Sequence, residues 1–447
     1  MKAKRRTVQR LRSNTSLSAL VAATCLAARA AAGEFFTLKG HGGPIMGIAV
    51  SPTDQIATVS FDNAVGLWDG ATPQWLDGHE AAVNAVVFAE DGTVFSAGDD
   101  YTVRAWSSDG GETDVWTGHK GKVMSLALSP DGSLLASASW DNSIGIWPTD
   151  GGTPRFLTGH DGPVSDVAFT ADGTGLYSAS ADGSIRFWSL IDNTAPLPVA
   201  SHGFGVNEIE LNEAAGWLAY GAVDGGTRAI DLATGDTLAD LTLDRRPILS
   251  MTTSSDGTQL AVGDGEGYIM VVDTQNWRIT RDFRATQRGP VWALAFSNDG
   301  TNIHAGGLDP RMYSWPIAAM GDLEPMETGD PTFLRAPETM PNGERQFMRK
   351  CSICHTLTEG SARRAGPSLY EVFGRRAGTV SDYTYSEALN GSALVWDETT
   401  IDALFDIGPD DYIPGTKMPM QRITGAQDRA DLVQFLRDNT ASKEMSE

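Results

Sequence analysis

The chain has 447 residues, of which 41% are hydrophobic and 20% charged, so it can build packed cores and is too long for one typical domain. Its formal net charge of −23 argues against a nucleic-acid-binding protein, because the phosphate backbone would repel it. Three cysteines are too few for a disulfide-stapled scaffold, and the 49 glycines follow no collagen-like period.

The first 32 residues have the pattern of a secretory signal peptide. Six basic residues and no acid precede residue 13, and an apolar stretch of about 12 residues follows, too short to span a bilayer. Small residues at 28–30 or 30–32, Ala-Arg-Ala or Ala-Ala-Ala, suit a cleavage site; an uncleaved membrane anchor is the alternative. Cleavage after residue 32 would remove seven basic residues and no acid, which lowers the net charge from −23 to −30. We expect an exported protein with no transmembrane segment in the mature chain.

A repeat with steps of 38 to 42 residues runs through the first two thirds of the chain. Its marker is a Gly-His or Ser-His pair, with the histidines at His41, His79, His119, His160 and His202. Each unit reads as an alternating strand, a turn, a strand of small residues, an Asp-centred turn and a strand that ends on Trp or Asp. A period near 41 residues with four short strands per unit is typical of a β-propeller.

These units resemble the WD-repeat family over roughly residues 35–316, and residues 33–316 are assigned to the propeller. Residues 34–40 are similar to the outer strand with which such chains close the ring, which removes two exposed sheet edges. Seven closing residues predict seven blades: Trp68, Trp106, Trp147, Trp188, Asp231, Asp273 and Trp315.

The resemblance implies a structural hydrogen-bonded set in each blade, made of a histidine, a hydroxyl, a turn aspartate and a tryptophan. Blade 2 has Gly98 where the hydroxyl is expected, and blades 5 to 7 are degenerate. With five of the seven histidines assigned to blades, no imidazole cluster is left in the propeller for a zinc, copper or second haem site. The expected sets are His41, Ser60, Asp62 and Trp68; His119, Ser139, Asp141 and Trp147; and His160, Ser180, Asp182 and Trp188.

A Cys-x-x-Cys-His motif, Cys351 to His355, follows an acidic, proline-containing linker predicted over residues 317–340. This motif is typical of covalent c-type haem attachment, in which the two thiols form thioethers and the histidine ligates iron. The alternatives are a redox Cys-x-x-Cys pair or half of a zinc site, although no cysteine follows Cys354 to complete a zinc site.

Residues 341–447 resemble a class I cytochrome c of the mitochondrial and soluble bacterial type, through the segments GERQFMRKCSICHT, GPSLYEVFGRRAG, YIPGTKM and TGAQDRADLVQFLRDN. The resemblance implies a small all-α domain. It makes His355 and Met418 the axial iron ligands, with Met420 as the rival of Met418 and expected to pack in the crevice. The haem pocket it implies also contains Cys351, Cys354, Pro367, Arg375, Tyr385, Trp396 and Thr416.

The first and last helices of this domain are expected to pack on each other through Gly343 and Phe347. The last helix is expected to open with a capping box from Thr424 to Gln427 and to bury Ala430, Val433 and Leu436 on one face. Phe405 and Leu389 stand where the mitochondrial type has a tyrosine and often an asparagine, so we expect a more apolar crevice.

The combined pattern predicts an all-β seven-bladed propeller followed by an all-α cytochrome domain, in an exported electron carrier with one covalent haem c. Histidine and methionine ligation leaves the iron no open position, which favours an electron carrier over an enzyme. The propeller would dock a redox partner protein. A redox sensor or scaffold is one alternative, and the electron-entry subunit of an oxidoreductase with an unrecognised propeller cofactor is another. Haem c attachment occurs outside the cytoplasm, so the motif and the leader together predict a periplasmic location.

Charge is unevenly distributed along the chain. Residues 33–244 hold 7 basic and 29 acidic residues, whereas residues 245–316 hold seven of each. We expect the early blades to form an acidic arc that attracts a basic partner in a salt-dependent way. The haem edge near Arg375, Arg376 and Lys417 would then rest on the neutral late blades or meet an acidic acceptor.

Overall fold

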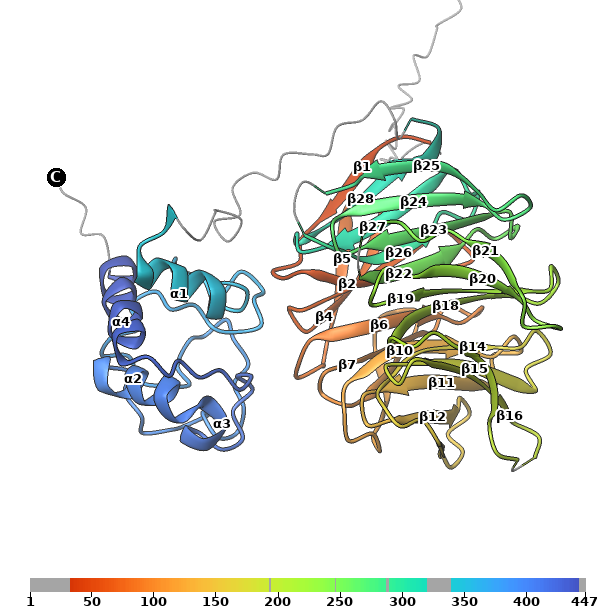
Figure 1. The fold of residues 1–447 in the computed structure, drawn as a ribbon. Helices are drawn as coiled ribbons and strands as arrows, with labels where there is room; N and C mark the ends of the chain where they lie inside the picture. Colours follow the sequence, from red (N-terminus) through yellow and green to blue (C-terminus); the bar gives the residue numbers. More distant parts are fainter. Residues whose placement is uncertain (1–32, 193, 246, 287–288, 320–338, 442–447) are drawn as a thin grey trace, which may run out of the picture.

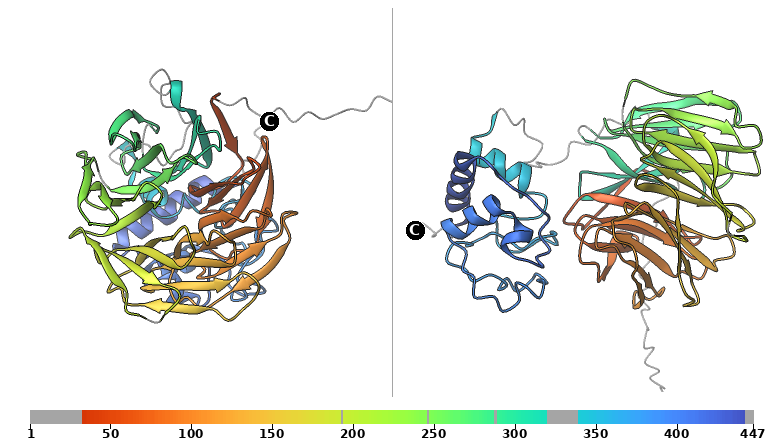
Figure 2. Two further views of the ribbon diagram at one scale, coloured as in Figure 1. Left: turned by 90° about the vertical axis from the view of Figure 1, so that its right-hand side faces the viewer. Right: turned by 60° about the horizontal axis from the view of Figure 1, so that its bottom comes forward.

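The computed structural model describes residues 33–441 except 193, 246, 287–288 and 320–338. In this part of the chain, 28 strands form seven four-stranded sheets arranged as a ring, and a smaller helical domain follows (Figure 1). Figure 2 shows that the helical domain lies against one face of the ring. The first strand of each blade contacts the first strand of the next all the way round, so the ring is closed.

Within each blade the strands pair antiparallel. Blades 1 to 4 comprise β2 (Ile45–Val50), β3 (Ile56–Ser60), β4 (Ala64–Asp69) and β5 (Thr72–Asp77); β6 (Val83–Phe88), β7 (Val94–Gly98), β8 (Val103–Trp106) and β9 (Glu112–Trp116); β10 (Val123–Leu128), β11 (Leu134–Ser139), β12 (Ser143–Pro148) and β13 (Arg155–Thr158); and β14 (Val164–Phe169), β15 (Gly175–Ser180), β16 (Ser184–Ser189) and β17 (Leu197–Ser201). Blades 5 to 7 comprise β18 (Val206–Asn212), β19 (Trp217–Ala222), β20 (Thr227–Asp231) and β21 (Thr237–Asp240); β22 (Ile248–Thr253), β23 (Gln259–Asp264), β24 (Tyr268–Asp273) and β25 (Arg278–Arg284); and β26 (Val291–Phe296), β27 (Asn302–Gly307), β28 (Arg311–Pro316) and β1 (Phe36–Lys39).

The last blade takes its outer strand from the beginning of the described chain. β1 pairs antiparallel with β28, with Phe36 opposite Ser314 and Lys39 opposite Arg311. The predicted ring closure is therefore confirmed. The pairing joins segments about 280 residues apart in the sequence and leaves the ring without an open seam.

The hydrogen-bonded set of blade 1 uses a different hydroxyl from the one predicted. The imidazole of His41 contacts Asp62 through Nδ1 (2.9 Å to Oδ2) and Thr58 through Nε2 (2.8 Å to Oγ1). The indole N–H of Trp68 donates to the same Thr58 oxygen at 2.8 Å. The prediction of Ser60 in this role is wrong. Instead, the Oγ of Ser60 accepts the backbone N–H of Asp62 within the turn.

The same two-residue correction applies to the next three blades. The hydroxyls that bridge histidine and tryptophan belong to Ser96, Ser137 and Ser178, not to Ser139 or Ser180. Blade 2 therefore has a complete set, and Gly98 is not a defect in it. Residues two apart share one face of a strand, so sequence alternation could not separate the two positions. The tertiary structure does so, because it places the hydroxyl of Thr58, Ser96, Ser137 or Ser178 within hydrogen-bond distance of both the imidazole and the indole of its blade.

Blades 5 to 7 keep only parts of this arrangement. In blade 5, His202 Nε2 lies 2.8 Å from Asp224 Oδ1, but no tryptophan completes the set. In blade 6, Asp264 pairs with Arg245 at 3.0 Å in place of a histidine. In blade 7, the indole nitrogen of Trp315 is buried with no hydrogen-bond partner. The predicted degeneracy of these blades thus reflects lost polar partners, while the four-stranded fold is kept.

The helical domain contains α1 (Asn342–Lys350), α2 (Glu398–Ile407), α3 (Pro409–Tyr412) and α4 (Ala426–Thr440). The predicted packing of the first helix on the last is confirmed. A Cβ on Gly343 would lie 2.1 Å from the carbonyl oxygen of Asp431, so only glycine allows α1 and α4 to approach this closely. Next to this contact, the rings of Phe347 and Phe435 are 5.4 Å apart.

Two predictions about α4 are wrong. The helix begins after Gly425, which makes no side-chain cap, so the expected capping box from Thr424 does not form. Ala430 is exposed. Val433 and Leu436 are buried as predicted, and the buried side of the helix also carries Arg429, Leu432 and Thr440. Arg429 is held in the core by its hydrogen bond to the carbonyl of Ile423 (2.8 Å) and its ion pair with Asp402 (2.9 Å).

Among the described residues, no helix is long and apolar enough to cross a membrane. The predicted leader, residues 1–32, and most of the predicted linker lie outside the described residues.

Candidate functional site

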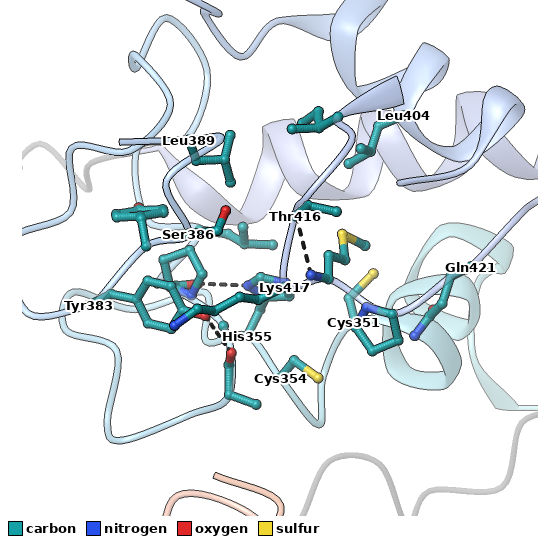
Figure 3. Close-up of a pocket in the computed structure, with 18 of the residues that line it drawn as sticks. Cys351, Cys354, His355, Tyr383, Ser386, Leu389, Leu404, Thr416, Lys417 and Gln421 are labelled. Atoms are coloured by element: carbon teal, nitrogen blue, oxygen red, sulfur yellow. Dashed lines mark hydrogen bonds between the residues drawn. The ribbon is translucent and has the colours of Figure 1, made fainter. Parts of the chain in front are cut away.

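A cavity opens inside the helical domain, and the residues of the Cys-x-x-Cys-His motif lie on its wall (Figure 3). Cys351 caps the C-terminal end of α1, where its N–H donates to the carbonyl of Phe347. The chain then turns so that the N–H of His355 donates to the carbonyl of Cys351 at 2.8 Å. This tight turn gives the five-residue motif its local shape and presents two thiols and one imidazole to the same cavity.

The imidazole of His355 is held in one orientation. Its Nδ1 lies 2.7 Å from the carbonyl oxygen of Pro367, which can only accept, so Nδ1 carries the proton. The lone pair of Nε2 is then left free for a metal. Desolvation lowers the pKa of His355, which favours the neutral imidazole that a metal requires. Gly366 makes this packing possible, because a Cβ there would lie 2.4 Å from Cε1 of the ring.

The two cysteines of the motif form no disulfide with each other. Burial raises the pKa of Cys351 to about 12 and that of Cys354 to about 11, so both are protonated at neutral pH. A redox-active Cys-x-x-Cys pair needs a thiol with a lowered pKa. The environment of these two thiols therefore disfavours the redox-pair alternative.

The two candidate methionines have different surroundings. Met418 lines the cavity and packs against the hydrophobic core of the domain. Met420 is 49% exposed, and its sulfur lies beside Gly408, away from the cavity. The expectation that Met420 packs in the crevice is wrong, because its side chain lies at the surface beside Gly408.

All nine residues predicted for the site line this one cavity. They are Cys351, Cys354, His355, Pro367, Arg375, Tyr385, Trp396, Thr416 and Met418. They come from segments far apart in the sequence. Arg375 is fixed in place by donating to the backbone carbonyls of Ser368 (2.7 Å) and Tyr370 (2.5 Å). Leu389 and Phe405 also line the cavity, in agreement with the prediction of a more apolar crevice.

Sequence reasoning missed several polar residues of the cavity. Tyr383 faces it and donates its hydroxyl to the carbonyl of Ala365 at 2.7 Å. The signal for Tyr383 is its place two residues before the predicted pocket residue Tyr385. Ser386 Oγ and Gln421 Oε1 are buried at the cavity without any hydrogen-bond partner. Ser386 follows the predicted pocket residue Tyr385 directly, whereas Gln421 reaches the cavity through the fold and has no such signal.

The lining fits a haem group. Two thiols, a free imidazole nitrogen and a thioether sulfur are the donor set of a c-type haem, and the remaining wall is mostly apolar. Buried polar atoms without partners are rare in native structures and call for an explanation. The unpartnered oxygens of Ser386 and Gln421 are explained if the polar atoms of a bound group reach them.

Comparisons with known proteins divide the chain in the same way. The family described as "Cytochrome c" matches residues 341–440. Cytochrome c of Nigella damascena is 41% identical over 102 residues, which are 22% of this chain and 89% of that protein. Cytochrome c of Gossypium barbadense is 44% identical over 101 residues, which are 22% of this chain and 88% of that protein. Through its C-terminal domain, the chain belongs to the cytochrome c family.

The N-terminal part is a WD40-repeat propeller. The family described as "WD domain, G-beta repeat" matches residues 34–69, 71–107, 110–148, 151–189 and 277–315. The crystal structure of the WD40 β-propeller domain of Doa1 is similar in fold, with a TM-score of 0.55 and 20% identity, over 62% of this chain and 94% of that one. The matched ranges leave out residues 190–276, which contain blade 5 and the first three strands of blade 6, two of the blades with degenerate polar sets.

The two domains together establish the broad function. A cytochrome c domain is a haem-carrying electron-transfer module, and a WD40 propeller is a protein-interaction module. The chain therefore joins covalent haem chemistry to a surface for binding proteins.

Proposed function

We propose that this protein is an exported single-electron carrier with one covalently attached haem c, and that its propeller serves to bind protein partners. The observation that carries the proposal is the convergence of Cys351, Cys354, His355 and Met418 on one mostly apolar cavity. When bound, the haem supplies an iron centre that takes up and releases one electron.

In this proposal each residue has a distinct task. Cys351 and Cys354 would hold the haem through thioether bonds, and His355 would ligate iron through the Nε2 that its bond to Pro367 leaves free. Met418, which lines the same cavity, would be the second iron ligand. Iron held by both side chains would have no position left for a substrate, which favours electron transfer over substrate chemistry.

The apolar wall supports the same role. Phe405 is 4% exposed and Leu404 is 7% exposed, and both border the cavity. These side chains keep water away from the site. Methionine ligation and limited access of water both favour ferrous iron, so we expect a high reduction potential.

Export to the periplasm is the part of the proposal that rests on sequence alone. Residues 1–32 have the basic, apolar and small-residue regions of a signal peptide, and covalent haem c attachment takes place outside the cytoplasm. Mass spectrometry of the purified protein tests this. We expect a mature chain that begins near residue 33, whereas a chain that retains its first 32 residues would contradict it.

The haem assignment is tested on the full-length protein by pyridine haemochrome analysis and intact mass. We expect one haem per chain that survives denaturation and acid–acetone extraction. Changing Cys351→Ser together with Cys354→Ser should abolish covalent attachment, while Cys25→Ser, in the predicted leader, should leave it intact. An extractable haem, or two haems per chain, would overturn the proposal.

A further inference from the structure

The haem cavity is bordered by residues of both domains. Its mouth faces the propeller loops of blades 1 and 2, which contribute Phe61, Asn63, Glu80, Ala81, Ala82 and Asp99 to its lining. Figures 1 and 2 show the helical domain beside the part of the ring that contains β4, β5 and β7. The side of the cytochrome domain on which its cavity opens is therefore the side turned toward the propeller.

Charged side chains hold this contact together. The guanidinium of Arg363 pairs with the carboxylate of Asp77 and lies over the ring of Trp75, 4.4 Å from its centroid. Nearby, Lys417 Nζ lies 3.8 Å from Glu80 Oε1. In both pairs the propeller supplies the acid and the cytochrome domain supplies the base.

The backbones also approach closely at this contact. A Cβ on Gly42 would lie 2.3 Å from the carbonyl oxygen of Ala362, so only glycine leaves room for the loop that carries Arg363. We call Gly42, Trp75, Asp77 and Glu80 the docking face. It sits at the start of the acidic region of residues 33–244. The expectation that this side of the cytochrome domain rests on the neutral late blades is wrong, because Lys417 and Arg363 pair with acids of the early blades. Arg375 and Arg376, which were expected at the same edge, donate to backbone carbonyls of their own domain.

We propose that the docking face binds the haem edge of this chain's own cytochrome domain, and that an external redox partner reaches the haem only after the two domains separate. Exposed ion pairs contribute modestly and weaken as salt screens them. Asp77 and Glu80 are exposed over about two thirds of their side chains, at 66% and 68%. A contact of this kind is reversible. A partner that competes for the docking face, or for Arg363 and Lys417, would open it.

Small-angle scattering of the full-length holoprotein tests the docking directly. We expect the radius of gyration to rise between about 20 mM and about 500 mM salt, as the Debye length falls from roughly 20 Å to a few ångström. The double variant Asp77→Lys/Glu80→Lys should be expanded already at low salt. We expect it to shift the docking equilibrium about tenfold, which corresponds to about 1.4 kcal/mol.

The matched control makes the same change of charge elsewhere on the propeller. Asp114 and Asp161 are exposed acids of the propeller. Asp161 follows the histidine before blade 4, just as Glu80 follows the histidine before blade 2. Asp114→Lys/Asp161→Lys should remain compact at low salt. Adding Arg363→Asp to Asp77→Lys should restore compactness, because the ion pair is rebuilt with its charges exchanged. Equal radii for the docking variant, the control and the unaltered protein at low salt would overturn the proposal.

A kinetic measurement tests the consequence for electron transfer, which rests on the proposed function. Ferricyanide takes one electron from the reduced haem and becomes ferrocyanide. At low salt, the docking variant should be oxidised severalfold faster than the charge-matched control, because its haem edge is uncovered. Expansion without any gain in rate would show docking that does not gate the haem and would overturn that part of the proposal. If no haem is attached, the proposed function fails, while scattering still decides whether the domains dock.

Discussion

The bridging hydroxyl of each early blade provides the sharpest test of the propeller structure. In blade 3, Ser137 Oγ lies 2.7 Å from Nε2 of His119 and 2.8 Å from the indole nitrogen of Trp147. The serine hydroxyl donates to the imidazole and accepts from the indole, while Nδ1 of His119 donates to Asp141 at 2.9 Å. Burial lowers the pKa of His119, which keeps the neutral ring that this pattern needs.

Replacing Ser137 with alanine leaves two buried groups without partners. Ser137 is fully buried, and Trp147 and His119 are 2% and 6% exposed, so water cannot replace the lost oxygen. An unsatisfied buried polar group costs about 1–3 kcal/mol, so Ser137→Ala should lower the free energy of unfolding of the propeller by about 3 kcal/mol. Urea denaturation followed by tryptophan fluorescence measures this loss.

A conservative variant separates the hydrogen bonds from simple packing. Blade 1 has a threonine, Thr58, at the position that corresponds to Ser137. Like Ser137, Thr58 lies opposite a glycine of the neighbouring strand. Ser137→Thr keeps the hydroxyl and should cost less than about 1.5 kcal/mol. Ser96→Ala in blade 2 should repeat the loss of about 3 kcal/mol. If the alanine and threonine variants of Ser137 were equally stable, the bridging role would be refuted.

Three further outcomes are expected. Met418→Ala should remove the methionine-to-iron charge-transfer band of the oxidised protein and lower its reduction potential, whereas Met420→Ala should spare both; exchanged behaviour would reverse the ligand assignment. Burial lowers the pKa of His304 to about 4, against about 6.5 in an unfolded chain, so the propeller should lose roughly 3 kcal/mol of stability as the pH falls from 6.5 to 4. His304→Leu should flatten that dependence in urea titrations at several pH values, and an unchanged slope would contradict the buried neutral state. Gly343→Ala should destabilise the cytochrome domain by about 1–3 kcal/mol in thermal unfolding, because the new Cβ meets the carbonyl of Asp431; an unaffected midpoint would argue against the close helix contact.

Local patterns in the sequence were enough to identify both domains and the chemistry of the site. The repeat period and the closing residues predicted seven blades, because each blade is a local unit whose strands follow one another in the chain. The five-residue motif predicted the covalent haem site for a similar reason, since its thiols and histidine lie within one turn of chain. The resemblance to cytochrome c then placed Met418 and the other lining residues, which now share one cavity.

Tertiary structure decided the features that depend on register and on contacts between distant segments. Strand pairing selected Thr58 over Ser60, although both lie on the same face of β3. The packing of α4 on α1 and α2 buries Val433 and Leu436 but leaves Ala430 exposed. Packing of the two domains brought Arg363 to Asp77, across 286 positions of the sequence. Composition had indicated only that the early blades are acidic. A count of charges describes a region of the sequence, and it cannot show that the cytochrome domain of the same chain packs against that region.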